Sequence, residues 1–341
     1  MSSTSQYTTF TDLYTGLQEL ARVTTGVTAT ENIAKRLIDA AHHALYIERG
    51  DKLYWAKEQA TLTTHPQYTT GTLTATEGSG TITGASTEWN TSDGIHNNMR
   101  IGGKIRISGR YETYEITAVA SDTSATISPV WAGDTASSLT YVYFEDEYAL
   151  ASDFTKPVDT RSFDSGCRIR LVGDSDFRMY APRNSSPSSY PKIAHVVNKP
   201  FASNATPVRK IQFAPPPADR QVIPYTYVTG NIVVQNDGTR AASFSATTDQ
   251  PIMPIRFREV IVLGALERWL RDRKDDAQRA LLVRQQYEQM VQLMIGDQDR
   301  GHQRPSIRVD RRGRRSRAIR PWRSGVDRFD IDGSFDRLED W

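Results

Sequence analysis

The stretch that decides the fold is Ile255–Asp297, IRFREVIVLGALERWLRDRKDDAQRALLVRQQYEQMVQLMIGD, which follows a long region rich in Thr, Ser and β-branched residues. Its apolar residues recur at helical spacing, and we predict two helices, at about 255–273 and 275–296. The second has one apolar stripe, whereas the first is apolar over a wider arc and is expected to pack on two sides. The residues predicted to be core or inter-helix contacts here are Leu266, Trp269, Tyr287 and Met290.

The first fifty residues contain a second pair of predicted helices. Leu13 and Leu17 belong to an apolar stripe with three- and four-residue spacing. Thr30 is the predicted N-cap of the next helix, Leu37 lies on that helix's apolar stripe, and Gly50 stands where the helix should end. Both helical pairs have an apolar face that must be covered. We therefore predict that the hairpins from the two chain ends close into one helical bundle.

Between these helices the pattern becomes that of short strands. Residues 69–144 alternate in polarity, as at Ile105 and Ile107, and contain turn residues such as the EGSG at 77–80. This pattern favours a small antiparallel barrel or sandwich. A second β-rich stretch covers about 155–248, with proline-rich loops. The expected class is α+β, with these boundaries: a helical hairpin at 1–52, β domains at 53–150 and 151–253, a helical pair at 254–296, and a charged tail at 297–341.

The composition limits the class of protein. With 341 residues and 38% apolar content, the chain can bury a sizeable core. Its one cysteine, Cys167, excludes an intramolecular disulfide and a cysteine-rich metal site. The N-terminus shows no secretory-signal pattern, and no apolar run is long enough to cross a bilayer. We expect a protein made in a reducing compartment and not bound to a membrane.

Motifs for catalysis or metal binding are absent from the sequence. His42 and His43 occupy adjacent helix positions that point about 100° apart, so we expect surface or partly packed histidines rather than metal ligands. The run Arg328–Glu339 resembles a calcium loop, but an arginine stands at its first ligand position. The run Asp93–His96 is expected to be a β-domain loop, and the acidic run Glu145–Glu147 a solvated connection between the β regions. We therefore predict no enzymatic activity, no cofactor and no metal.

The tail is the strongest local anomaly in a chain whose formal net charge is only +2. Residues 300–323 contain ten arginines, no lysine and one acidic residue, whereas residues 324–341 contain six carboxylates and two arginines. Arginine without lysine suits bidentate contacts with carboxylates and carbonyls as well as phosphate. We favour a protein-docking arm over direct DNA binding or a solvated tail without a partner. Its predicted contact residues are Arg304, Arg308, Arg311, Arg312, Arg314, Arg315, Arg317, Arg320, Trp322 and Trp341.

The order of these elements resembles the head-to-tail connector (adaptor) proteins of tailed bacteriophages, over about residues 10–296. The β module is similar at DKLYWAKEQATLTTHPQYTTGTLTATEGSGTITGASTEWN (51–90) and RISGRYETYEITAVASDTSATISPVWAG (106–133). DEYALASDF (146–154) resembles the following linker, with Ala151 where the family usually has proline. IQFAPPPADRQVIPYTYV (211–228) and PIRFREVIVLGALERWLRDRKDD (254–276) look like the family's closing strands and C-terminal helices.

This resemblance implies a structural virion protein at the head–tail junction, made in the host cytoplasm. In that family a ring, usually of twelve copies, sits under the portal and continues the DNA channel towards the tail. The expected partners are therefore the portal ring, a tail nozzle or tail-completion protein, further copies of the chain, and DNA passing through without sequence specificity. A C-terminal extension often wedges into the portal, but the long arginine-rich tail here matches no family motif.

Two other functions remain open from the sequence. One is a DNA-contacting virion or packaging protein that uses the basic tail to neutralise phosphates. The other is a tail-fibre component, suggested by the Thr/Ser-rich β regions, although the flanking long helices argue against it.

Overall fold

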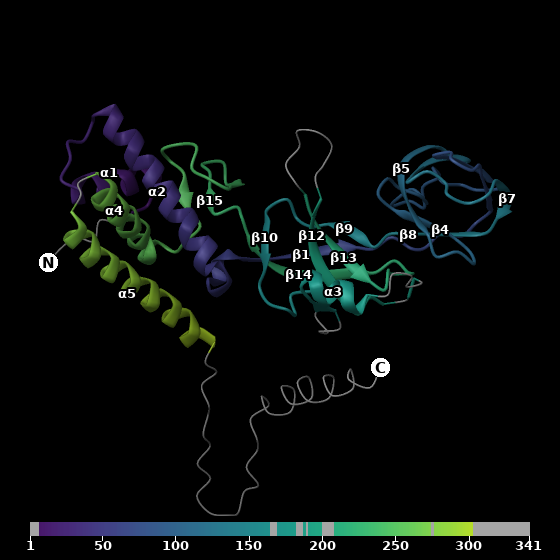
Figure 1. Cartoon of the computed structure of the whole chain (residues 1–341). Helices are drawn as coiled ribbons and strands as arrows, with labels where there is room; N and C mark the ends of the chain where they lie inside the picture. The colour runs from purple at the N-terminus through teal and green to yellow at the C-terminus, as the bar shows by residue number, and fades with distance from the viewer. Residues whose placement is uncertain are drawn as a thin grey trace, which may run out of the picture. The chain divides into compact units, whose positions relative to one another are not determined.

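The fold of the chain is α+β, as the sequence predicts: helices from both chain ends pack together and flank antiparallel sheets. In the computed structural model, the purple N-terminal helices lie beside the green-to-yellow C-terminal ones (Figure 1). The structure describes residues 7–163, 169–181, 187–188, 190–199, 208–273 and 276–302. The chain divides into a unit of residues Met1–Gln298 and a second unit, Asp299–Trp341, of which only the end of the last helix is described.

The helical bundle contains α1 (Phe10–Leu20), α2 (Thr28–Arg49), α4 (Glu259–Arg273) and α5 (Ala277–His302). Thr9 and Asp12 form a reciprocal capping box at the start of α1. The helix α5 continues six residues beyond the predicted end at 296, so Gly296 lies inside the helix rather than at its end. The shared core of these helices includes Leu13, Leu17, Ile38, Leu45, Val260, Leu266, Leu270, Val283 and Met294.

The predicted N-cap of α2 is wrong. Val27 is the N-cap, and Thr30 lies in the first turn, where its hydroxyl donates to the Val27 carbonyl at 2.8 Å. Gly50 does end α2, but in a right-handed conformation with φ −54°. A methyl group at residue 50 would lie 2.8 Å from Cγ1 of Val228. Close packing of the helix end against a distant strand, rather than a left-handed turn, therefore explains this glycine.

The first β region is a partly closed barrel. Its seven antiparallel strands are β2 (Thr72–Ala75), β3 (Thr81–Ala85), β4 (Lys104–Ile107), β5 (Thr113–Ser121), β6 (Ser124–Ser128), β7 (Ala136–Leu139) and β8 (Tyr141–Phe144), in the order β7-β2-β3-β6-β5-β4-β8. Consecutive strands β7 and β8 lie at opposite edges, so the sheet curls back on itself. The alternating residues Ile105, Ile107, Tyr114 and Ile116 are buried, and Trp89 and Trp131 complete the core.

Two further sheets share a separate core, and they combine strands that are distant in the sequence. One has the order β1-β14-β10, from β1 (Lys57–Thr63), β14 (Val222–Thr229) and β10 (Phe154–Pro157). The other has the order β11-β12-β13-β9, from β11 (Arg170–Leu171), β12 (Ile193–Lys199), β13 (Val208–Ala214) and β9 (Glu147–Ala149), with β11 and β12 parallel. Buried aromatic residues, including Phe154, Phe163, Phe213 and Tyr225, fill this core.

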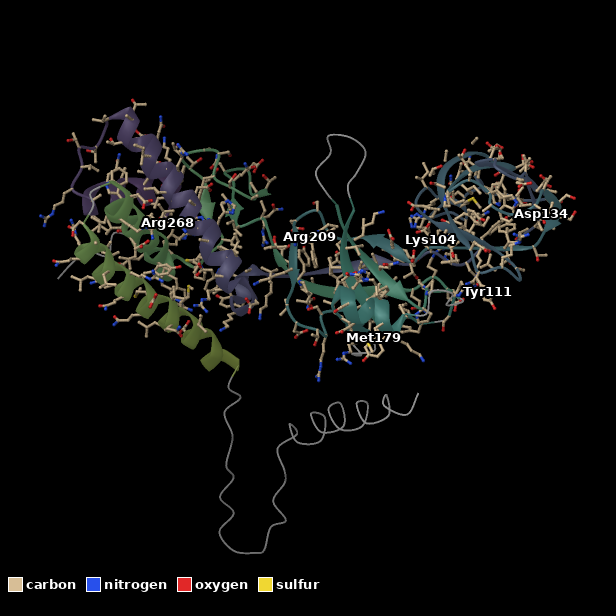
Figure 2. The ribbon with its side chains drawn as sticks, in the orientation of Figure 1. Lys104, Tyr111, Asp134, Met179, Arg209 and Arg268 are labelled. Carbon is tan, nitrogen blue, oxygen red and sulfur yellow. The ribbon has the colours of Figure 1, made fainter. Side chains whose placement is uncertain are left out.

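A short helix interrupts the second β region, where the sequence predicts strands and loops. Helix α3 (Asp174–Tyr180) follows β11 and begins with two acidic residues, which stabilise a helix N-terminus. Only Phe177 of α3 is buried, and its ring lies 4.0 Å from that of His195 on β12. Its neighbour Met179, like Tyr111 after β4, extends into solvent (Figure 2).

A third small sheet and the loop that joins its last two strands pack on the helices. The sheet has the order β16-β15-β17, from β15 (Val233–Val234), β16 (Arg240–Ala241) and β17 (Gln250–Pro251). In the loop before β17, the Phe244 ring stacks on that of Phe10 at 4.3 Å. The backbone N–H groups of Phe10 and Thr11 donate to the Asp249 and Thr247 carbonyls. The connecting 3-10 turns are η1 (Gly50–Lys52), η2 (Tyr54–Ala56) and η3 (Ile255–Phe257).

Across the residues described, no helix is long and apolar enough to span a bilayer.

Candidate interaction surface on the helical bundle

The predicted bundle residues lie at different depths in the helical domain. Leu266 and Trp269 of α4 are buried, whereas Leu37 of α2 and both Tyr287 and Met290 of α5 are half-buried against the same core. The two predicted residues of α5 therefore lie at the edge of the core, whereas Val283 and Met294 of the same helix are buried in it. Its Leu282 and Leu293, three turns apart on one face, are more than half exposed.

Small side chains on α2 and α4 make room for the Tyr287 ring. A methyl group at Gly264 would lie 3.2 Å from Cε2 of Tyr287 and 3.5 Å from Cβ of Ala41. Burial, and then the neighbouring Glu48 carboxylate, raise the pKa of the Tyr287 phenol. The phenol therefore remains neutral and can hydrogen-bond in both directions.

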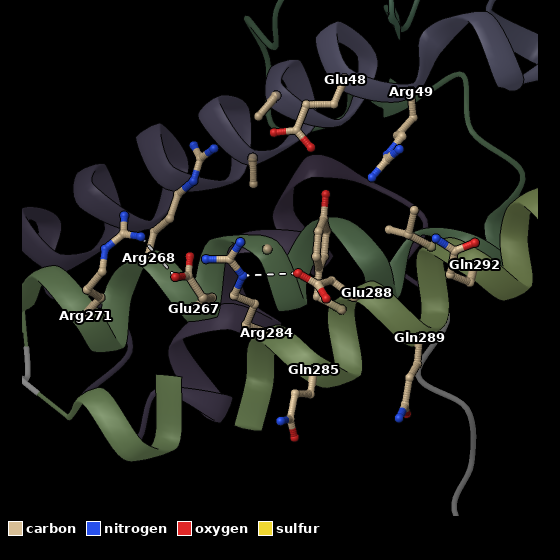
Figure 3. Close-up of a pocket in the computed structure, with 15 residues that line it drawn as sticks. Glu48, Arg49, Glu267, Arg268, Arg271, Arg284, Gln285, Glu288, Gln289 and Gln292 are labelled. Carbon is tan, nitrogen blue, oxygen red and sulfur yellow. Dashed lines mark hydrogen bonds and ion pairs between the residues drawn. The ribbon is translucent and has the colours of Figure 1, made fainter. Parts of the chain in front are cut away.

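Around this ring, α2, α4 and α5 enclose a polar cleft of about 900 Å³, which we call the bundle cleft (Figure 3). Four arginines and three glutamates line it: Arg49, Arg268, Arg271, Arg284, Glu48, Glu267 and Glu288. Arg271 pairs with Glu267 at 3.0 Å, and Arg284 pairs with Glu288 at 3.1 Å. From α2, Glu48 and Arg49 point into the space between the helices (Figure 3). Gln289 and Gln292 of α5 also line the cleft, and the Gln292 side chain points towards Arg49 (Figure 3).

Several buried polar groups of the bundle have no hydrogen-bond partner in the described structure. They are both ring nitrogens of His42, Nε2 of Gln18 and Nε1 of Trp269. His42 is fully buried, so the expectation of a surface or partly packed histidine is wrong for it. Burial lowers the pKa of His42 to about 3, and the nearby charges of His43 and Arg258 act in the same direction. His43 is more exposed and lies 3.7 Å from Asp39.

Arg258 ties three segments of the bundle together. It is buried, and its guanidinium donates to the carbonyls of Met253, Thr8, Tyr7 and Pro251. These four neutral acceptors satisfy the charge without a carboxylate. The residue therefore anchors the N-terminal segment and the β17 loop to the start of α4.

The acidic run Glu145–Glu147 is not the solvated connection that the sequence predicts. Glu145 and Asp146 are buried because cations lie opposite them. Arg100 makes a bidentate pair with Glu145, and Lys104 of β4 (labelled in Figure 2) lies 2.6 Å from Asp146. Tyr143 donates to Glu145 at 2.7 Å. The run is thus a paired structural cluster.

The loop Asp93–His96 is held by local hydrogen bonds. The backbone N–H groups of His96 and Ile95 donate to Asp93 and hold the pKa of its carboxyl at about 2, and Arg220 pairs with the same carboxylate. Among the residues that the structure covers, no cluster of three or more His, Cys, Asp or Glu could hold a metal ion.

The predicted docking residues of the tail lie outside the described residues. These are Arg304, Arg308, Arg311, Arg312, Arg314, Arg315, Arg317, Arg320, Trp322 and Trp341. Cys167 and the calcium-like run 328–339, which were not among the predicted docking residues, also lie outside the described residues. The sequence reasoning also missed the bundle cleft. Arg268, Arg271 and Arg284 were visible only as polar positions on amphipathic helices, and their convergence with Arg49 depends on how α2, α4 and α5 pack.

A comparison of the chain with protein-family models, with curated proteins and with solved structures finds no match.

Proposed function

We propose that this protein is a structural head-to-tail adaptor of a bacteriophage virion, without catalytic activity. In this role, copies of the chain form a ring, dodecameric by resemblance, that docks on the portal and continues the DNA channel towards a nozzle or tail-completion protein. The observation that carries the proposal is the arrangement of the chain: helices from its two ends share one core, and the β regions are inserted between them. The resemblance in sequence order implies this arrangement.

The surface of α5 gives a physical basis for ring formation. Leu281, Leu282 and Leu293 are exposed on this helix, and exposed apolar side chains are stabilised when a neighbouring subunit covers them. Repetition of one heterologous contact around an axis closes a ring. The arginine-rich tail supplies a second contact, in which guanidinium groups bind carboxylates or carbonyls of the portal.

Mixing the purified chain with portal rings of the same virus tests the proposal. We expect a larger particle by mass photometry and a ring of added density under the portal by negative-stain microscopy. Two proteins that stay separate at micromolar concentration would contradict the adaptor function. Antibody labelling of intact virions provides an independent test, and it should mark the head–tail junction.

Removal of the tail separates the adaptor from the DNA-contacting alternative. Because α5 runs to His302 and Asp297 pairs with Arg256, the truncation should remove residues 303–341 rather than start at 297. We expect the truncated chain to keep its helical signal, to lose stable docking on the portal, and to change little in non-specific DNA affinity. A large fall in DNA affinity with a steep salt dependence, and normal docking, would instead favour the DNA-contacting protein.

A further inference from the structure

The bundle cleft has more cationic groups than its own carboxylates can neutralise. Its two ion pairs use Arg271, Arg284 and their glutamates. Arg49 and Arg268 have no hydrogen-bond or ion-pair partner within the part of the chain that the structure describes. Both act electrostatically on Tyr287, as does Glu48, so their charges surround one ring. The cleft therefore has two arginines available and one carboxylate to balance them.

These groups suit a carboxylate-bearing peptide. A guanidinium binds a carboxylate through two parallel N–H···O bonds, and arginine is preferred wherever this geometry is needed. Gln292, which points towards Arg49 (Figure 3), adds a side-chain amide that can pair with a peptide backbone. At about 900 Å³, the cleft lies near the upper end of the range of ligand pockets, roughly 300–1,000 Å³, and can take several side chains.

The chain contains one segment with the complementary charge. Residues 327–341 carry six carboxylates, Asp327, Asp330, Asp332, Asp336, Glu339 and Asp340, against two arginines. The aromatic residues Phe329, Phe335 and Trp341 are interspersed among them. The arginine block that precedes this segment has the same sign as Arg49 and Arg268, so repulsion excludes it from the cleft.

Length allows this segment to reach another molecule. Residues 303–326 separate the end of α5 from Asp327, and these 24 residues can span about 80 Å when extended. In a ring, every copy has one cleft and one acidic segment. If each segment binds the cleft of the neighbouring copy, every cleft and every segment is occupied. Assembly also holds the segment near the next cleft at a high effective concentration.

We propose that the bundle cleft binds the acidic segment 327–341 of a neighbouring copy. This inference rests on the proposed function, because the ring brings the copies together. The acidic segment thereby links adjacent subunits, while the arginine block is left for the portal. The two oppositely charged blocks of the tail then have two different partners.

Photo-crosslinking of the full chain in the portal complex tests this exchange. The variant Gln292→p-benzoylphenylalanine places a photoreactive group on the side of α5 that faces Arg49 (Figure 3), and a mixture of ¹⁴N- and ¹⁵N-labelled copies identifies the source of each cross-linked peptide. We expect peptides that join residue 292 of one isotope to 327–341 of the other. Adding Arg49→Glu and Arg268→Glu should reduce this yield about tenfold, because each removes a partner of the acidic segment. The matched control, Arg36→Glu with Lys52→Glu on exposed positions outside the cleft, changes the net charge equally and should not reduce it.

Reversing the charge of the acidic segment as well as that of the cleft provides a complementary experiment. In copies with the reversed cleft, replacing Asp327, Asp330 and Asp332 by lysine should restore the inter-copy cross-link. Rings on the portal without tail cross-links, cross-links confined to one isotope, or cross-links to the portal alone would each overturn the exchange but leave the adaptor function standing. Failure to form rings at all would overturn both proposals.

Discussion

The helical bundle and the partly closed barrel differ in how their buried polar groups are paired. In the barrel, Trp89 donates to Tyr141 at 2.8 Å, Tyr141 donates to the Thr70 carbonyl, and Trp131 donates to the Asp134 carbonyl. In the bundle, His42 and Trp269 are buried without such partners among the residues described. A core whose polar groups are all hydrogen-bonded favours one rigid structure. Buried polar groups without hydrogen bonds and an open cleft allow a binding partner to add stabilising contacts. The bundle is therefore the region better suited to take a partner.

The largest expected change in stability concerns the bundle core. Leu266→Ala removes a buried side chain between α4 and its neighbours, and we expect the free energy of unfolding to fall by about 2–5 kcal/mol. Denaturant titration followed by circular dichroism at the helical band measures it. Leu281→Ala, at an exposed position of α5, is the control and should stay within about 0.5 kcal/mol of wild type. Equal stability of both variants would show that α4 does not pack as described.

The second prediction concerns the paired core of the barrel. Tyr141→Phe keeps the ring but leaves Nε1–H of Trp89 without its acceptor, which should cost about 1–3 kcal/mol. Thermal denaturation followed by tryptophan fluorescence includes this region, because two of the six tryptophans, Trp89 and Trp131, are buried there. Tyr111→Phe, whose side chain is 75% exposed, provides the control. A melting temperature of Tyr141→Phe that matches the control would mean that the hydrogen bond adds no net stability.

The third prediction uses acid to test the unpaired histidine of the bundle. The pKa of His42 is about 3 in the folded chain and about 6.5 when exposed, so the unfolded state binds the proton first. Its contribution to stability is complete above pH 6.5 and is lost as the pH falls towards 3. At pH 5.5 the loss should be about 1.4 kcal/mol. Urea titrations at pH 7.5 and 5.5 should show a difference in stability that is about 1.4 kcal/mol smaller in His42→Leu than in wild type or His43→Asn, because the lowered pKa values of His96 and His195 add losses of the same sign in all three chains. Persistence of the full difference in His42→Leu would assign it to other groups.

The smallest effect is expected on the surface of the cleft. Arg284 and Glu288 form an exposed pair four residues apart on α5, with side chains 60% and 62% accessible. Arg284→Gln should change the free energy of unfolding by less than about 0.5 kcal/mol, because solvent screens an exposed pair. The same urea titration checks it, and circular dichroism monitors the helical content. Gln278→Ala, an exposed substitution near the start of the same helix, is the matched control. A loss above about 1 kcal/mol for Arg284→Gln alone would show that the pair supports the packing of α5, and that the cleft wall is part of the fold.

The sequence by itself determined the class of the fold and the position of its main elements. Apolar residues at three- and four-residue spacing lie on one face only if the segment is a helix. Alternating apolar residues lie on one face only if the segment is a strand. These local rules located α1, α2, α4 and the strands of the barrel, including the buried Ile105 and Ile107. They also indicated a bundle, because two helical pairs with uncovered apolar faces had to meet.

Predictions from local sequence patterns failed where the burial of a residue depends on contacts with residues distant in the sequence. The carboxylates Glu145 and Asp146 are buried only because Arg100 and Lys104, from an earlier part of the chain, lie against them. His42 was expected to be a surface or partly packed residue, yet the core of the bundle encloses it. Gly50 looked like an ordinary helix end, whereas Val228 of a distant strand leaves no space for a side chain.

The bundle cleft is the clearest case of a feature that only the tertiary structure decided. Arg49, Arg268 and Tyr287 stand on three helices, and nothing in their spacing along the chain predicts that they converge. Their convergence follows from the small residues Ala41 and Gly264, which let the helices and the ring approach. Periodicity determines which face of a helix is buried, but the distance and angle between helices depend on the volumes that meet there.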